Sequence, residues 1–78
     1  SRKLTEYALL QILCTPPQQQ SSARAVGRAL REIDYIGLLE DGNLYVLLSS
    51  TDHAAGAFVQ QKIEKLGVNT RVIEESEL

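Results

Sequence analysis

Arg31 and Asp34 are the residues of this sequence whose types and spacing are best suited to binding chemistry. The arginine guanidinium is a planar, permanently charged donor that suits paired hydrogen bonds to phosphate or carboxylate oxygens. A separation of three residues would place both side chains on one side of the last turn of a helix. An exposed ion pair within a helix has the same spacing and contributes little to stability. The pair therefore indicates either a binding site or a surface ion pair.

The other side chains that could do chemistry are isolated along the sequence. His53 is the one histidine and has no second candidate ligand nearby, so we expect a surface residue. Cys14 ends an apolar run and fits a small core residue, while the stretch 49–51, Ser-Ser-Thr, fits a capping turn between a strand and a helix. No phosphate-binding loop or dinucleotide fingerprint occurs. These residues predict neither a catalytic site nor a metal site.

The composition is that of a small globular domain with a slight negative charge. Of 78 residues 44 % are hydrophobic, and eight Lys and Arg against ten Asp and Glu give a formal net charge of −2. This balance argues against a nucleic-acid polymer as partner, and only Tyr45 and Tyr7 are candidates for stacking on RNA bases. A single cysteine excludes an internal disulfide and suits a reduced, cytoplasmic compartment. No apolar run reaches the length of a membrane span, about 18 residues.

The length also limits how stable the chain can be by itself. Below about 80 residues a single hydrophobic core supplies roughly 3–5 kcal/mol of net stability. We therefore expect one domain over residues 1–78, excised from a longer protein. A ligand, or a neighbouring regulatory or membrane domain, would then contribute to its stability and its role.

Four stretches have the composition of β-strands. An apolar run near the start of the chain predicts a buried strand, which stops before Pro16-Pro17. Asp41-Gly42 between two β-rich stretches predicts a hairpin. The chain ends in an acidic tail over residues 74–78. The predicted strands are residues 7–14, 35–39, 44–49 and 68–73.

Two amphipathic stretches predict helices between these strands. The first, residues 23–33, includes Gly27, for which close packing against the sheet would be a reason. The capping candidates are Ser21 or Ser22 for the first helix, Thr51 or Asp52 for the start of the second, and Gly67 for its end. The resulting order βαββαβ predicts an α/β (α+β) ferredoxin-like fold. Its two helices would cover one face of a four-stranded antiparallel sheet of strand order 4-1-3-2.

The stretch from Val26 to Lys62 resembles the second half of a GGDEF (diguanylate cyclase) domain. Such domains commonly contain Leu-Arg-x-x-Asp, a short strand, a Gly-Gly-Asp/Glu-Glu-Phe hairpin, an apolar strand, and then Thr-Asp with an alanine-rich helix. The corresponding stretches here follow one another without gaps. They are Leu30 to Asp34, Tyr35 to Leu39, Glu40 to Leu44, Tyr45 to Leu48, and Ser50 to Ala55. The resemblance implies a truncated, degenerate GGDEF-like fold.

Departures from the family pattern imply that this domain is not an enzyme. Gly42 and Asn43 stand at the acidic positions of the signature, which serve metal binding and catalysis in active cyclases. Those cyclases also carry a metal-binding aspartate after the first strand, whereas residues 14–18 contain no carboxylate. Two-metal phosphoryl chemistry needs such oxygen ligands. The resemblance therefore implies no catalytic residues, no metal and no cofactor.

The part of the family pattern that this sequence keeps resembles the family's inhibitory site, an Arg-x-x-Asp motif that binds cyclic di-GMP. Arg31 and Asp34 match that motif, and Lys62 stands where related domains carry a second basic residue. The arginine can contact phosphate or the O6/N7 edge of guanine, and the carboxylate can accept from guanine N1–H and N2–H. Degenerate domains of this kind, the PelD type among them, act as cyclic di-GMP receptors in bacterial exopolysaccharide and biofilm signalling.

The resemblance thus implies a cytoplasmic cyclic di-GMP receptor, either soluble or as the cytoplasmic portion of an inner-membrane protein, with Arg31, Asp34 and Lys62 as ligand-binding residues. If so, we expect Arg31 and Asp34 to be exposed without ligand, so that substituting either has little effect on folding. A second interpretation stays open, in which a catalytically dead domain serves only protein interaction or dimerisation. In that case Arg31 and Asp34 would form a surface ion pair.

Overall fold

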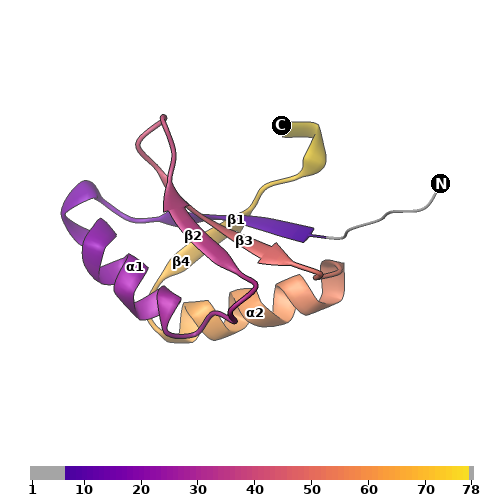
Figure 1. The fold of residues 1–78 in the computed structure, drawn as a ribbon. Helices are drawn as coiled ribbons and strands as arrows, with labels where there is room; N and C mark the ends of the chain where they lie inside the picture. Colours follow the sequence, from indigo (N-terminus) through magenta and orange to yellow (C-terminus); the bar gives the residue numbers. More distant parts are fainter. Residues whose placement is uncertain (1–6, 78) are drawn as a thin grey trace.

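The computed structural model describes residues 7–77, in which two helices cover one face of a four-stranded antiparallel sheet (Figure 1). The strands are β1 (Tyr7–Leu13), β2 (Tyr35–Leu38), β3 (Leu44–Ser49) and β4 (Asn69–Val72). The helices are α1 (Gln19–Gly27) and α2 (His53–Lys65), with 3₁₀ turns at Pro16–Gln18 and Glu75–Glu77. The strand order β2-β3-β1-β4 confirms the predicted topology and α+β class. The ends of the predicted domain, residues 1–6 and 78, lie outside the described residues.

The hairpin between β2 and β3 forms at the predicted place. Tyr35 pairs with Leu47, and the ladder continues to the pair of Leu38 and Leu44. Gly42 has a φ of 83°, a left-handed conformation that glycine adopts without steric cost. The Asn43 backbone N–H donates to the carboxylate of Asp41 over 2.9 Å, which closes the tip of the loop. Asp41 and Gly42 therefore favour the hairpin through the local conformation and hydrogen bonding of the loop.

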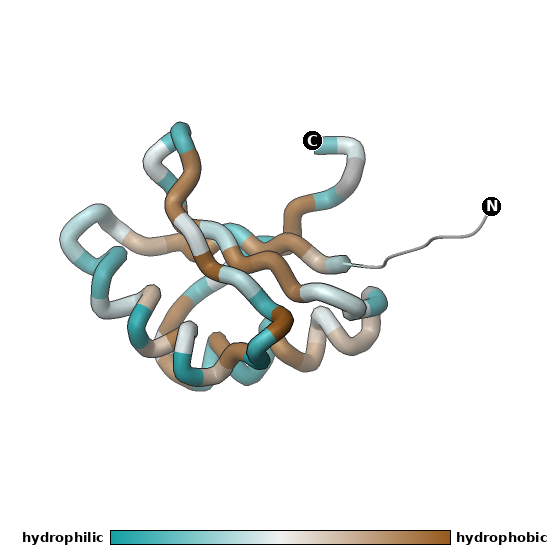
Figure 2. Tube along the Cα trace, viewed as in Figure 1, coloured by the Kyte–Doolittle hydropathy of each residue, from teal (hydrophilic) through white to brown (hydrophobic). Residues whose placement is uncertain are grey.

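The core lies between the sheet and the helices. Alternate residues of the two central strands point to the helical face, because successive side chains of a strand point to opposite faces. The buried core residues are Leu10 and Ile12 of β1, Leu44, Val46 and Leu48 of β3, Val26 of α1, Ile63 of α2, and Val68. Figure 2 shows the corresponding hydrophobic segments along the central strands. Cys14 packs against this core as predicted.

Helix α2 has the predicted ends and lies very close to β1. Asp52 caps its N-terminus by accepting from the Ala55 backbone N–H over 2.8 Å. Gly67 follows its C-terminus with a φ of 87°. A Cβ atom on Gly56 would lie 3.1 Å from the Cβ of Ala8, closer than most real contacts. A glycine at position 56 therefore allows the helix to sit directly on the sheet.

The prediction for the first helix is wrong at both ends. Helix α1 begins at Gln19 after a 3₁₀ turn and ends at Gly27, with Arg28 as its C-terminal cap. The hydroxyl of Ser21 donates to the carbonyl of Gln18 and does not cap the helix. A Cβ atom on Gly27 would meet nothing within 4 Å, so close packing does not explain this glycine. Its low helix propensity is instead consistent with the end of the helix.

The described part of the acidic end, up to Glu77, forms a short turn that is bonded to the sheet. A 3₁₀ turn over Glu75–Glu77 follows β4, and Glu77 forms a 2.8 Å ion pair with Arg71. Arg71 also donates to Gln11 of β1, so this segment is joined to the sheet. None of the helices in residues 7–77 has the length and apolar character that crossing a membrane requires.

Candidate functional site

The Arg-x-x-Asp stretch is a tight turn directly before β2. The Asp34 backbone N–H donates to the Arg31 carbonyl over 3.0 Å. In return, the Arg31 backbone N–H donates to Oδ2 of Asp34 over 2.9 Å. The predicted position in the last turn of a helix is therefore wrong. Short acidic side chains compete with helices by binding nearby backbone N–H groups, which is the physical reason here.

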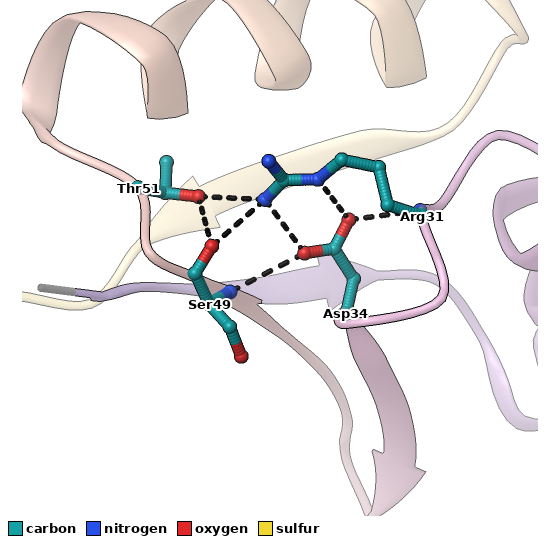
Figure 3. A network of polar contacts seen from close by, with 4 residues as sticks. All are labelled: Arg31, Asp34, Ser49 and Thr51. Atoms are coloured by element: carbon teal, nitrogen blue, oxygen red, sulfur yellow. Dashed lines mark hydrogen bonds and ion pairs between the residues drawn. The ribbon is translucent and has the colours of Figure 1, made fainter. Parts of the chain in front are cut away.

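Within this turn the two side chains form a paired ion bridge (Figure 3). Nε of Arg31 donates to Oδ2 of Asp34 over 2.9 Å, and Nη2 donates to Oδ1 over 2.8 Å. The hydrogen bond from Arg31 lowers the pKa of Asp34 below its ordinary value, against a smaller opposing effect of burial. The same bond raises the pKa of Arg31. Asp34 is therefore a carboxylate at neutral pH.

Two further residues connect this ion bridge to the end of β3 and the start of α2. The two protons of Nη2 of Arg31 are shared among Oδ1 of Asp34, the Ser49 carbonyl at 2.9 Å and Oγ1 of Thr51 at 2.8 Å. The Ser49 backbone N–H donates to Oδ1 of Asp34 over 3.3 Å. Figure 3 shows the four residues as one network. The arrangement ties the β3–α2 connection to the turn before β2.

The composition of residues 49–51 predicts only a capping turn and does not reveal their part in this network. The signal that could have found it is the hairpin register. Because Tyr35 pairs with Leu47, continuing the antiparallel register places Asp34 opposite Leu48 and next to Ser49. The Asp34 carboxylate thus accepts the Ser49 N–H just beyond the end of the β2 ladder.

Asp34 is buried, which contradicts the expectation that both side chains are exposed without ligand. Its side chain is 2 % exposed, whereas that of Arg31 is 50 % exposed. Four N–H donors point at its two oxygens, three from Arg31 and one from Ser49. The carboxylate therefore has an internal structural role in this conformation, and Arg31 is the member of the pair that faces solvent.

The guanidinium of Arg31 keeps one nitrogen for further contacts. Nε and Nη2 donate within the network, and no partner for Nη1 occurs among residues 7–77. A guanidinium carries two protons on each terminal nitrogen, and its planar face can stack on an aromatic base. The site can therefore offer two oriented donors and a cationic face to an anionic or guanine-containing ligand.

Lys62 is not joined to this network by any bond. It lies exposed in the last turn of α2. Within the described part of the chain it takes part in no hydrogen bond or ion pair. The third predicted ligand-binding residue is thus a surface cation on a different element from Arg31 and Asp34.

Comparison with protein-family models, curated proteins and solved structures finds no match. The geometry around Arg31 and the motif resemblance are therefore the features that indicate a function. Residues 7–77 contain no group of three or more His, Cys, Asp or Glu side chains that could hold a metal ion. The side chain of His53 is outside the described atoms.

Proposed function

We propose that this domain is a non-enzymatic receptor for cyclic di-GMP and that Arg31 is its main contact. The observation that carries the proposal is the half-exposed guanidinium of Arg31, held in one orientation while Nη1 stays available. An arginine that is already ordered loses little conformational freedom on binding. Cyclic di-GMP offers phosphate oxygens and guanine O6 and N7 atoms, all of which accept from such a donor.

Asp34 supports recognition in this proposal by orienting Arg31. It binds the guanidinium through two hydrogen bonds, one from Nε and one from Nη2. Direct acceptance from guanine N1–H or N2–H requires one of its four present donors to leave. The proposal therefore gives Asp34 a positioning role in the free domain and a guanine contact only where the ligand displaces a donor.

The proposed setting is the cytoplasm, where the domain would regulate exopolysaccharide production through a neighbouring domain of a longer protein. A calorimetric titration with cyclic di-GMP tests the receptor function, with cyclic di-AMP as the matched ligand that lacks guanine. Saturable binding of cyclic di-GMP and weaker binding of cyclic di-AMP are expected. Absence of heat and of any chemical-shift change at saturating cyclic di-GMP would reject the proposal.

Incubation with GTP and Mg²⁺ separates a receptor from an active cyclase. We expect no cyclic di-GMP product, because residues 14–18 and positions 42 and 43 carry no carboxylate that could hold the metal ions. Product formed by purified protein would contradict the non-enzymatic assignment.

Lys62 should make a smaller contribution than Arg31. In the proposal it adds one charge-assisted contact, so Lys62→Ala should weaken cyclic di-GMP binding by roughly fivefold to thirtyfold. Lys62→Arg should bind as well or better, because the charge is retained. Lys65→Ala removes a neighbouring cation from the same helical turn and serves as the control. Equal affinity for the wild type and both Lys62 variants would remove this residue from the site.

The open face of the sheet favours protein interaction as a second candidate function. Tyr35, Leu47 and Leu9 are successive cross-strand neighbours on this face, and Tyr35 is 63 % exposed. Exposed apolar surface of this kind is common at interfaces. A second copy of the chain is the occupant to test, by sedimentation of the wild type and of Leu47→Glu. A monomer at all concentrations would argue against this function.

A further inference from the structure

We infer that Thr51 is a positioning residue for Arg31 and determines which edge of the guanidinium faces a ligand. The inference rests on the proposed receptor function, since it concerns the same site. Thr51 is 2 % exposed, so it is shielded from direct contact with a ligand. Its effect on binding would pass through Arg31.

The hydroxyl of Thr51 is oriented by a second bond. Oγ1 donates to the Ser49 carbonyl over 2.8 Å and accepts from Nη2 of Arg31 over 2.8 Å. Because a hydroxyl has one proton, the bond to Ser49 leaves only acceptor capacity toward Arg31. The pair of Thr51 Oγ1 and Ser49 carbonyl therefore forms a fixed acceptor surface on one side of the guanidinium.

The backbone between them explains how both acceptors reach one nitrogen. Ser50 has a φ of 51°, in the left-handed region that residues other than glycine adopt at a steric cost. This conformation turns the chain sharply between β3 and α2. The Asp52 cap then fixes the start of α2 immediately after Thr51. The strained backbone of Ser50 thus lies between the two acceptors, Ser49 and Thr51, that bind Arg31.

The two sides of the guanidinium have different partners. Asp34 binds the edge made by Nε and Nη2, and Thr51 with Ser49 binds Nη2 from the other side. Oγ1 of Thr51 and the Ser49 carbonyl are the two acceptors of Nη2 outside the turn that carries Arg31 and Asp34. With Thr51 in place Nη2 is held from two directions, which leaves Nη1 as the outward donor.

The test compares Thr51→Val with Thr51→Ser. Valine keeps the shape of threonine and removes the hydroxyl, whereas serine keeps the hydroxyl and removes the methyl group. We expect Thr51→Val to weaken cyclic di-GMP binding by about fivefold to tenfold, the loss of one hydrogen bond to a charged group. Thr51→Ser should stay within about twofold of the wild type. Thermal unfolding of both variants shows whether any loss of affinity merely follows loss of stability.

A double-variant experiment shows whether the effect passes through Arg31. Lysine has no Nη2 atom, so adding Thr51→Val to Arg31→Lys should change the affinity less than twofold. An equal loss in both backgrounds, or wild-type affinity in Thr51→Val, would overturn the inference.

A ligand-free measurement separates this inference from the receptor function. Solvent exchange of the Arg31 Nε proton, followed by NMR, should be several-fold faster in Thr51→Val and unchanged in Thr51→Ser. A wild type that does not bind cyclic di-GMP rejects the receptor function, whatever the exchange rate. Unchanged exchange in Thr51→Val rejects the positioning role, whatever the affinity.

Discussion

Replacing Arg31 by alanine is expected to weaken cyclic di-GMP binding roughly tenfold to hundredfold, the range for a well-oriented arginine contact to guanine or phosphate. The reason is that Nη1 of Arg31 has no partner within residues 7–77, so an oriented and half-exposed guanidinium can donate to the ligand. Calorimetric titration of the wild type and the variant measures the change. The folded fraction of Arg31→Ala is checked by circular dichroism, because Asp34 loses two of its donors in this variant.

Two further variants make this result specific. Arg24→Ala removes the same charge from the last turn of α1 and should change the affinity less than threefold. Arg31→Lys keeps a charge but not the planar fork, so its affinity should lie between those of the wild type and Arg31→Ala. Full-strength binding by a folded Arg31→Ala protein would assign Arg31 and Asp34 to fold stability alone.

Replacing Asp34 by asparagine should lower the free energy of unfolding by about 2–3 kcal/mol at pH 7. The reason is that the buried side chain would accept fewer hydrogen bonds from the Arg31 guanidinium and from the backbone N–H groups. The carboxylate is 2 % exposed and accepts from Arg31 and Ser49. An asparagine side chain of the same size has one acceptor oxygen and no charge. Urea unfolding of both proteins measures the difference.

The destabilisation by Asp34→Asn should depend on pH. The hydrogen bond from Arg31 lowers the pKa of Asp34 in the folded protein. Its stabilising effect is therefore complete above the pKa of the unfolded chain, about 3.9, and is lost as the pH falls through the lower folded value. The difference in unfolding free energy between wild type and Asp34→Asn should shrink from pH 7 to pH 3.

Glu32→Gln is the matched control for this experiment. It removes a carboxylate from an exposed position of the same turn, so the change at pH 7 should stay within about 0.5 kcal/mol. A difference between wild type and Asp34→Asn that is equally large at pH 3 would show that shape, not charge, accounts for the effect. An effect at pH 7 no larger than that of Glu32→Gln would contradict the structural role of Asp34.

Much of the fold follows from local signals that the sequence carries by itself. Asp41-Gly42 favours a tight connection whatever surrounds it, and the structure has the hairpin there. Asp52 accepts from a backbone N–H at the start of α2, and Gly67 adopts a left-handed conformation just after its end. Both effects act within a few residues of the chain. The apolar run of residues 44–48 predicts strand β3, but because it is apolar on both faces it does not determine which face is buried. With four strands in the order βαββαβ, these signals suffice for the topology.

The site itself was decided by tertiary structure. Apolar residues at helical spacing continue past Gly27, yet α1 ends there. The Asp34 side chain instead closes a turn by accepting from the Arg31 backbone N–H. Helical periodicity does not predict this turn. The antiparallel pairing of β2 with β3 then brings Ser49 to the carboxylate, and the left-handed Ser50 brings Thr51 to the guanidinium.

The types and spacing of Arg31 and Asp34 were thus enough to single out the pair, because the two residues are close in the chain. Their burial and their remaining donors were not predictable from that spacing. Both depend on Ser49 and Thr51, which lie 15 to 20 residues further along the chain. The pairing of β2 with β3 and the turn after β3 bring those groups within hydrogen-bond distance. As a result Asp34 is a buried acceptor, and the half-exposed Arg31 keeps Nη1 available as a donor.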